Sequence, residues 1–176
     1  MKSHATTLML AITVSFFLFS CSKKTNNNET ITTQDRTFMA QASAGNSAEI
    51  QTAQLADSIS DTAAIQSFAQ MIITDHTNAQ NDLKALGNNI MVPVTDSVDG
   101  MHQSFMDSLK MMSGRPFDSL YITRQIADHQ NAIAIFEQEI NSGNRTEVVS
   151  YANKYLPTLK MHLQKADSIS QAMHYQ

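Results

Sequence analysis

Four stretches of the chain carry apolar side chains at alternating intervals of three and four residues, which is the spacing of one face of an α-helix. The face of the first stretch comprises Phe38, Ala42, Gly45, Glu49, Thr52, Ala56 and Ile59, and that of the second comprises Ile65, Phe68, Ile72, His76, Ala79, Leu83 and Leu86. The corresponding residues of the third stretch are Ile122, Gln125, His129, Ala132, Phe136 and Ile140, and those of the fourth are Val148, Ala152, Tyr155, Leu159, His162, Ala166, Ile169 and Met173. The β-branched residues never alternate over a useful length, so the pattern predicts an all-α protein.

Capping and turn residues divide these stretches into four predicted long helices. The first covers about 35–60, and Asp61 is the predicted N-cap of the second, which ends at Gly87. Pro116 begins the third helix, because proline is favoured in a first helical turn. Pro157 is expected to kink the fourth helix one turn before its histidine.

The segment 90–116 interrupts the helical pattern. Proline and glycine residues at 93, 100, 114 and 116 bracket a short predicted helix over 101–112. Short, long and short connections describe two antiparallel helix hairpins joined by a long crossover, which is a known topology of four-helix bundles. The second and third long helices then run parallel. These features predict one four-helix bundle domain over 35–174.

The N-terminal region is typical of a bacterial export signal. A basic start precedes an apolar run over 8–19, which is too short to span a bilayer comfortably, so 1–20 is a predicted signal peptide. The run ends in Leu18-Phe19-Ser20-Cys21, which resembles the lipobox of bacterial lipoproteins, in which the cysteine is lipidated. The polar segment 21–34, rich in Asn and Thr, is then a lipidated flexible linker.

Lipidation of Cys21 would hold the mature chain on a membrane, because each buried acyl methylene contributes about 0.8 kcal/mol. Ser22 carries no acidic retention signal of the enterobacterial kind, which favours the outer membrane, facing the periplasm. The chain has 12 Lys and Arg against 16 Asp and Glu, and its net charge of −4 argues against nucleic acid as a partner. Cys21 is the only cysteine, which excludes an intrachain disulfide and a thiolate metal cluster.

One ionisable residue interrupts the apolar face of each long helix: Glu49, His76, His129 and His162. Counted from the predicted turns at 1.5 Å rise per residue, the four side chains reach similar heights and could converge on one layer. One interpretation is a polar layer in which Glu49 accepts hydrogen bonds from the imidazoles. The other is a site for a divalent transition metal, since a carboxylate and imidazoles are ligands of zinc, iron or copper.

Three further residues could support this layer from outside. The segments 73–79 and 126–132 match at their Ile, Asp, His, Asn and Ala positions, which places Asp75 and Asp128 directly before two of the histidines. A preceding residue lies about 100° around the helix, so we expect these acids to face a neighbouring helix or solvent. Tyr121, two turns before the third-helix histidine, either reaches the layer with its hydroxyl or packs at its boundary.

Two other metal chemistries have weaker support. The di-iron carboxylate proteins use Glu-x-x-His, whereas Ile73 and Leu159 stand three residues before His76 and His162. The crossover contains Met101, His102, Met106, Met111 and Met112, and thioethers suit cuprous copper. Two of these methionines, Met101 and Met112, also make an ordinary apolar helix face with Phe105 and Leu109.

The chain resembles the family called domain of unknown function 4142 over about 36–170. The resemblance lies in Phe68-Ala69-x-Met71-x3-Asp75-His76, Phe117-Asp118-x2-Tyr121-x7-His129 and Leu156-Pro157-x-Leu159-x2-His162-Leu163. It implies a ferritin-like fold, a place in the bacterial envelope and an acid at Glu49, but no agreed activity. We therefore expect a lipid-anchored binding or structural module rather than an enzyme, with a metal-binding bundle as the alternative.

Overall fold

The computed structural model describes residues 29–174, and this part of the chain is all-helical with no strands. Its helices are α1 (Thr33–Ile59), α2 (Ala63–Ile90), α3 (Gly100–Lys110), α4 (Gly114–Ser142) and α5 (Thr146–Ala172). The predicted signal peptide and Cys21 lie outside the described residues. Among residues 29–174, no helix combines the length and apolar character needed to cross a membrane.

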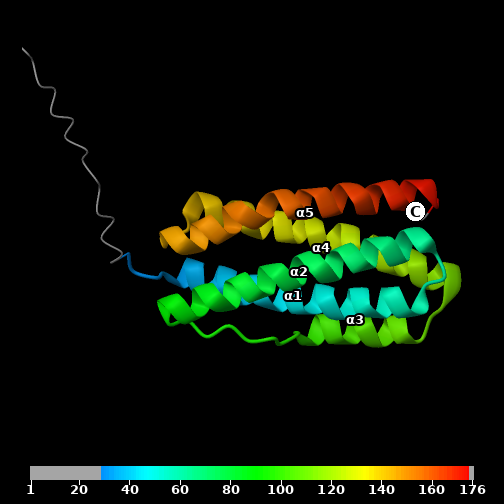
Figure 1. The fold of residues 1–176 in the computed structure, drawn as a ribbon, viewed down its shortest axis with the longest axis horizontal. Helices are drawn as coiled ribbons and strands as arrows, with labels where there is room; N and C mark the ends of the chain where they lie inside the picture. Colours follow the sequence, from blue (N-terminus) through cyan, green and yellow to red (C-terminus); the bar gives the residue numbers. More distant parts are fainter. Residues whose placement is uncertain (1–28, 175–176) are drawn as a thin grey trace, which may run out of the picture.

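The four long helices form a helical bundle of two hairpins (Figure 1). Helix α1 packs on α2 and helix α4 packs on α5, while α1 also lies beside α4 and α2 beside α5. Helices α2 and α4 begin at the same end, where the Thr62 hydroxyl donates to Asp118 Oδ2 at 2.6 Å. They therefore run parallel, as expected. At the other end, Asp35 Oδ1 accepts from the backbone N–H of Asn144 and Arg145 at 2.9 and 3.1 Å.

Several helix boundaries differ from their predictions. Helix α4 begins at Gly114 rather than at Pro116, and α3 ends at Lys110 rather than at Met112. Thr62, not Asp61, is the N-cap residue of α2. Helix α2 also continues past Gly87 to Ile90, and the chain reverses at Met91, whose φ of 58° is left-handed. Gly87 instead permits a close contact, because a Cβ atom there would lie 2.5 Å from the carbonyl oxygen of Val92. Glycine therefore serves packing here rather than helix termination.

Apolar side chains fill the two ends of the bundle and leave a polar level between them. One cluster consists of Ala53, Ala56, Ile65, Phe68, Ala69, Ile72, Leu109, Phe117, Tyr121, Ile122 and Ala166. The other consists of Phe38, Met39, Ala42, Leu83, Val92, Phe136, Val148, Tyr151, Ala152 and Leu159. On each of the four long helices, the ionisable residue of the predicted apolar face lies between residues of one cluster and residues of the other. The fold thus places Glu49 and the three histidines near the middle of the length of the bundle.

Gly45 occupies the middle of α1, where a Cβ atom would meet nothing within 4 Å. We predict that Gly45→Ala raises the free energy of unfolding by about 1 kcal/mol, because alanine has the higher helix propensity. Urea denaturation measures the change. Gly87→Ala is the matched control and should destabilise the protein, since its methyl group would collide with the Val92 carbonyl. An unchanged or lower stability of Gly45→Ala would contradict this description of α1.

Candidate metal centre

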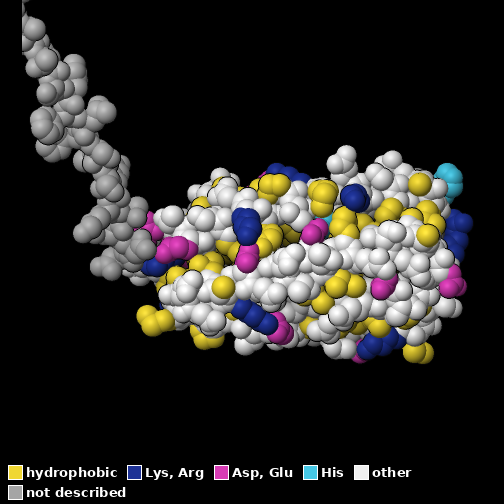
Figure 2. Space-filling model, in the orientation of Figure 1, with side chains coloured by type: hydrophobic (Ala, Val, Ile, Leu, Met, Phe, Trp, Pro, Cys, Tyr) yellow, Lys and Arg dark blue, Asp and Glu magenta, His cyan; other side chains and the backbone are white. Residues whose placement is uncertain are grey.

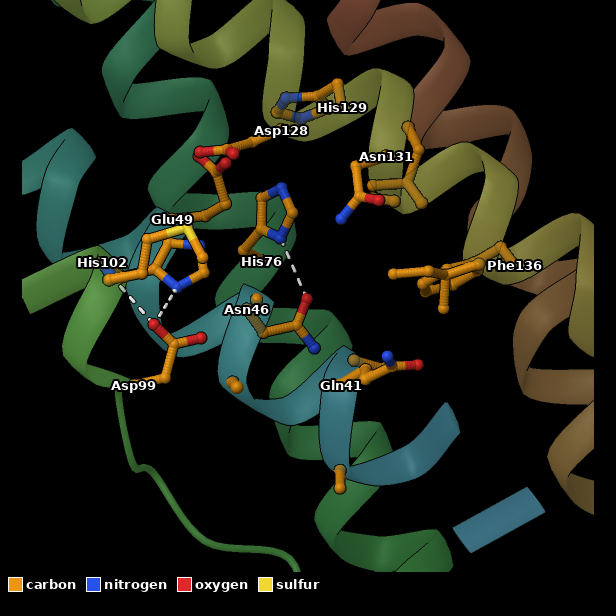
Figure 3. A pocket seen from close by; sticks show the side chains of 18 of the residues that line it. Gln41, Asn46, Glu49, His76, Asp99, His102, Asp128, His129, Asn131 and Phe136 are labelled. Carbon is orange, nitrogen blue, oxygen red and sulfur yellow. Dashed lines mark hydrogen bonds and ion pairs between the residues drawn. The ribbon is translucent and has the colours of Figure 1, made fainter. Parts of the chain in front are cut away.

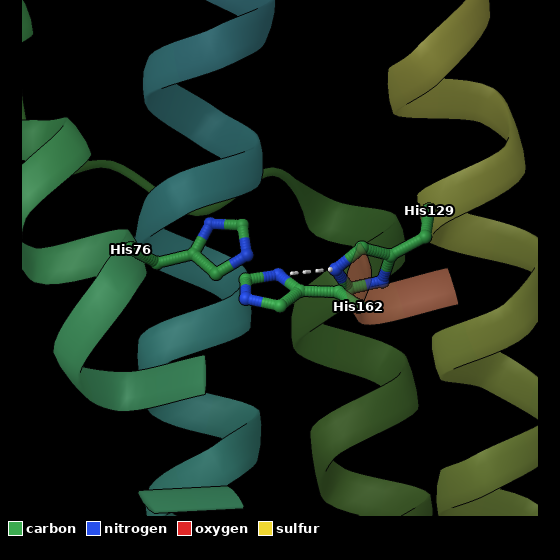
Figure 4. A group of neighbouring side chains, drawn as sticks. All are labelled: His76, His129 and His162. Carbon is green, nitrogen blue, oxygen red and sulfur yellow. Dashed lines mark hydrogen bonds between the residues drawn. The ribbon is translucent and has the colours of Figure 1, made fainter. Parts of the chain in front are cut away.

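Three histidines from three helices meet in the interior of the bundle (Figure 4). His76 of α2, His129 of α4 and His162 of α5 each offer one ring nitrogen, and these nitrogens lie within 4.8 Å of one another. The ring centroids are 5.2–5.7 Å apart, and all three side chains are buried. The predicted convergence of the imidazoles is therefore observed.

Local sequence explains why the rings fit at this level. Each histidine lies on the buried face of its helix, so the packing of the two hairpins turns all three rings inward. The next residue on the face is alanine in each case: Ala79, Ala132 and Ala166.

The outer nitrogen of each ring is held by an oxygen acceptor. His76 Nδ1 donates to Asn46 Oδ1 at 2.9 Å, and His129 Nδ1 donates to the backbone carbonyl of Gln125 at 2.8 Å. His162 Nε2 donates to Asp75 Oδ2 at 2.9 Å. An imidazole that donates through one nitrogen in its neutral form presents a lone pair at the other. The inner nitrogens are therefore three lone-pair donors.

Two of these inner nitrogens lie within hydrogen-bond distance of each other, and the third has no partner in the described part of the chain. His129 Nε2 and His162 Nδ1 are 3.2 Å apart, and His76 Nε2 is buried with no hydrogen-bond partner among the described residues. Burial lowers the pKa of all three imidazoles, and the neighbouring rings lower those of His76 and His162 further. Three neutral rings with converging lone pairs could hold a cation, a metal ion or a proton, between them.

Glu49 does not join the three imidazoles as the sequence predicted. Its carboxyl group accepts a hydrogen bond from Gln125 Nε2 at 2.6 Å, one helical turn before His129. Burial raises the pKa of Glu49 to about 8, so the side chain is protonated at neutral pH. The predicted polar layer, in which Glu49 accepts from the imidazoles, is therefore wrong, because height along a helix does not determine which neighbour a side chain meets.

The three residues expected to support the layer have different surroundings. Asp75 faces the neighbouring helix α5 and accepts from His162, whereas Asp128 pairs with Arg124 of its own helix at 2.6 Å. Tyr121 is fully buried between Phe68 and Phe117, and its hydroxyl has no hydrogen-bond partner among the described residues. Of the three, Asp75 contacts an imidazole.

Asn46 is a site residue that the sequence reasoning missed. Its side-chain amide donates to Gln80 Oε1 at 3.3 Å and to the Tyr151 hydroxyl at 3.2 Å, which directs its oxygen toward His76. The available signal was its position, three residues before Glu49 on the same side of α1. A polar residue beside an apolar face is common, so this signal has little specificity.

A cavity of about 420 Å³ leads to the histidines between α1 and α4 (Figure 3). His76 and His129 line it, and Glu49, Asp99 and His102 lie at the side formed by α3. A bound ion would therefore be accessible to small molecules from this direction.

The methionines of the crossover do not gather into a thioether site. Met106 is buried, whereas Met101 and Met111 are 68% and 86% exposed. Side chains with such different surroundings do not share one ion. The predicted apolar face is packed only in part, because Leu109 is buried whereas Met101 and Met112 are exposed.

Comparison with protein families and solved structures gives two similarities. The family model described as domain of unknown function (DUF4142) matches residues 20–169. The crystal structure of a DUF305 fragment from Deinococcus radiodurans is similar, with a TM-score of 0.71 and 15% sequence identity. That match covers 79% of this chain and 96% of the fragment, and at this identity it shows the fold alone. Comparison with curated proteins gives no match.

Proposed function

The chain belongs to the DUF4142 family, and because that name assigns no activity, we propose a function from the site itself: His76, His129 and His162 bind one divalent transition-metal ion. The single observation that carries the proposal is the convergence of three inner lone pairs whose outer nitrogens are all held by oxygen acceptors. Metal-bound histidines in proteins are oriented by such acceptors, which fix the tautomer and increase the basicity of the ligand nitrogen.

The donor set suits zinc or a neighbouring ion of the first transition series, and the inner nitrogens, which lie within 4.8 Å of one another, would draw together around a bound ion. Two nitrogens bound tetrahedrally at 2.0–2.1 Å lie about 3.4 Å apart, and the inner nitrogens of His129 and His162 are 3.2 Å apart. Imidazole is a ligand of Zn²⁺, Cu²⁺, Fe²⁺ and Ni²⁺. Three protein ligands leave one tetrahedral position for water or another small molecule, as in zinc sites that bind exogenous ligands.

Metal titration of the purified protein tests the proposal. After removal of bound metal with a chelator, the protein is titrated with Zn²⁺ in competition with a chromophoric chelator. The expected result is one ion per chain with release of few protons, because the imidazoles are already neutral near pH 7. Substoichiometric or weak binding would leave the histidines as a structural layer.

Asp75 should tune the affinity of this site. We predict that Asp75→Asn weakens zinc binding by about 10- to 100-fold, because His162 loses its anionic acceptor. Asp128→Asn is the matched control, since Asp128 also precedes a histidine but pairs with Arg124 instead. Its effect should be much smaller, as expected for a partly exposed ion pair. Equal losses in the two variants would argue against a specific role for Asp75.

We place this site in a ferritin-like four-helix bundle carried by a lipid-anchored envelope protein. Four long helices, each packed beside two others and joined through one crossover, support the bundle topology. The apolar run over 8–19 and the Leu18-Phe19-Ser20-Cys21 sequence support export and lipidation at Cys21. Interspersed acidic and basic side chains on the face in Figure 2, with no large area of one sign, agree with a partner other than nucleic acid.

A further inference from the structure

The cavity between α1 and α4 reaches the proposed metal centre from the side of His76 and His129. His76 and His129 line it, whereas His162 lies against Asp75 on the far side of the ring cluster. His76 Nε2, which has no partner among the described residues, belongs to the ring that borders the cavity. A small molecule in the cavity can therefore reach the fourth position of an ion bound by the three rings.

Small and apolar side chains form about half of the cavity wall. Ala44 and Gly45 on α1 leave the space open, and a Cβ atom at Gly45 would meet nothing within 4 Å. Ala132 and Phe136 of α4 and Leu159 of α5 supply the apolar surface further in. The volume of about 420 Å³ lies at the lower end of the range for small-molecule sites, roughly 300–1,000 Å³.

The charge of a divalent ion bound by the three rings, together with Arg124 in the cavity wall, favours an anionic head group, although Glu49, Asp99 and Asp128 also line the cavity. Three neutral imidazoles leave a divalent ion with its full charge, which is costly in a buried site. The nearby carboxyl groups already have partners: Glu49 accepts from Gln125, Asp128 pairs with Arg124, and Asp99 lies 2.8 Å from His102 Nδ1. An anion that enters through the cavity would supply the missing negative charge.

We propose that the cavity binds a small organic monocarboxylate, with its carboxylate on the metal and its apolar tail against Ala132, Phe136 and Leu159. This inference rests on the proposed metal site. It accounts together for the open space beside Gly45 and the apolar part of the lining.

Spectroscopic titration of the cobalt-loaded protein with acetate and hexanoate tests this inference. The visible absorption of Co²⁺ reports a change of its ligands, so both acids should alter the spectrum. Hexanoate should do so at a concentration at least about tenfold lower, because each methylene removed from water favours binding by about fourfold. If both acids produced half of the spectral change at the same concentration, or if neither changed the spectrum, the inference would be overturned. A protein that binds no cobalt would overturn the proposed metal site as well, so the two failures are distinguishable.

Filling the cavity provides the second arm of the test. Gly45→Leu should bind cobalt as the parent protein does but lose the preference for hexanoate, since leucine would occupy the space of the tail. Gly100→Leu is the matched control: a Cβ atom there also meets nothing within 4 Å, but Gly100 does not line the cavity. The control should retain the preference. A Gly45→Leu protein that binds cobalt and keeps the preference would contradict the assignment of the cavity.

Discussion

Replacement of His129 by alanine is expected to abolish stoichiometric metal binding, and His76→Ala and His162→Ala should do the same. Each variant removes one of the three converging nitrogens. The dissociation constant for Zn²⁺ should therefore rise by more than about 100-fold, which exceeds the usual effect of losing only a supporting hydrogen-bond partner. Competition with a chromophoric chelator measures the constant.

His102→Ala is the matched control for these three variants. His102 lies on α3, is paired with Asp99, and does not belong to the group of converging nitrogens. Its removal should leave the stoichiometry at one ion per chain. Loss of binding in His102→Ala, or unchanged affinity in any of the other three variants, would contradict the assignment of the ligands.

The substitution Glu49→Gln is expected to remove a pH-dependent loss of stability from the metal-free protein. Burial raises the pKa of Glu49 from 4.5 to about 8, so the folded chain holds this proton more tightly than the unfolded chain does. Its stabilising contribution is therefore complete below about pH 4.5 and is lost as the pH rises through 8. The slope approaches about 1.4 kcal/mol per pH unit in this interval, with a total on the order of 5 kcal/mol.

Urea denaturation of both proteins between pH 5 and pH 8 measures this contribution. The free energy of unfolding of the parent protein should fall relative to that of Glu49→Gln as the pH rises. Glu139, whose pKa burial raises to about 7, is present in both proteins, so its contribution cancels in the difference. Parallel curves would mean that the carboxyl group of Glu49 is hydrated rather than buried.

Hydrophobic periodicity was sufficient to predict the helices and the level of the histidines. The stripe that contains His76, with apolar residues on both sides, requires a helix with one buried face, and α2 covers that stripe. The position of a residue along the helix axis, counted from the predicted turn, depends on the helical rise alone. This count places His76, His129 and His162 at one level. This part of the candidate site follows from the sequence.

The contacts at that level depend on which helices are neighbours, and spacing along a single helix does not contain this information. Asp75 meets His162 because α2 packs beside α5. Glu49 meets Gln125 because α1 packs beside α4. The cavity depends on an absent side chain, at Gly45, which a sequence pattern treats as one more small residue on the stripe. These features required the packed structure.

The most direct test of the metal centre is anomalous X-ray scattering at the zinc absorption edge from crystals of the zinc-loaded protein. The structure predicts one peak per chain, about 2.0–2.1 Å from His76 Nε2, His129 Nε2 and His162 Nδ1. No peak among the three rings, or a peak elsewhere such as between Asp99 and His102, would contradict the proposed function.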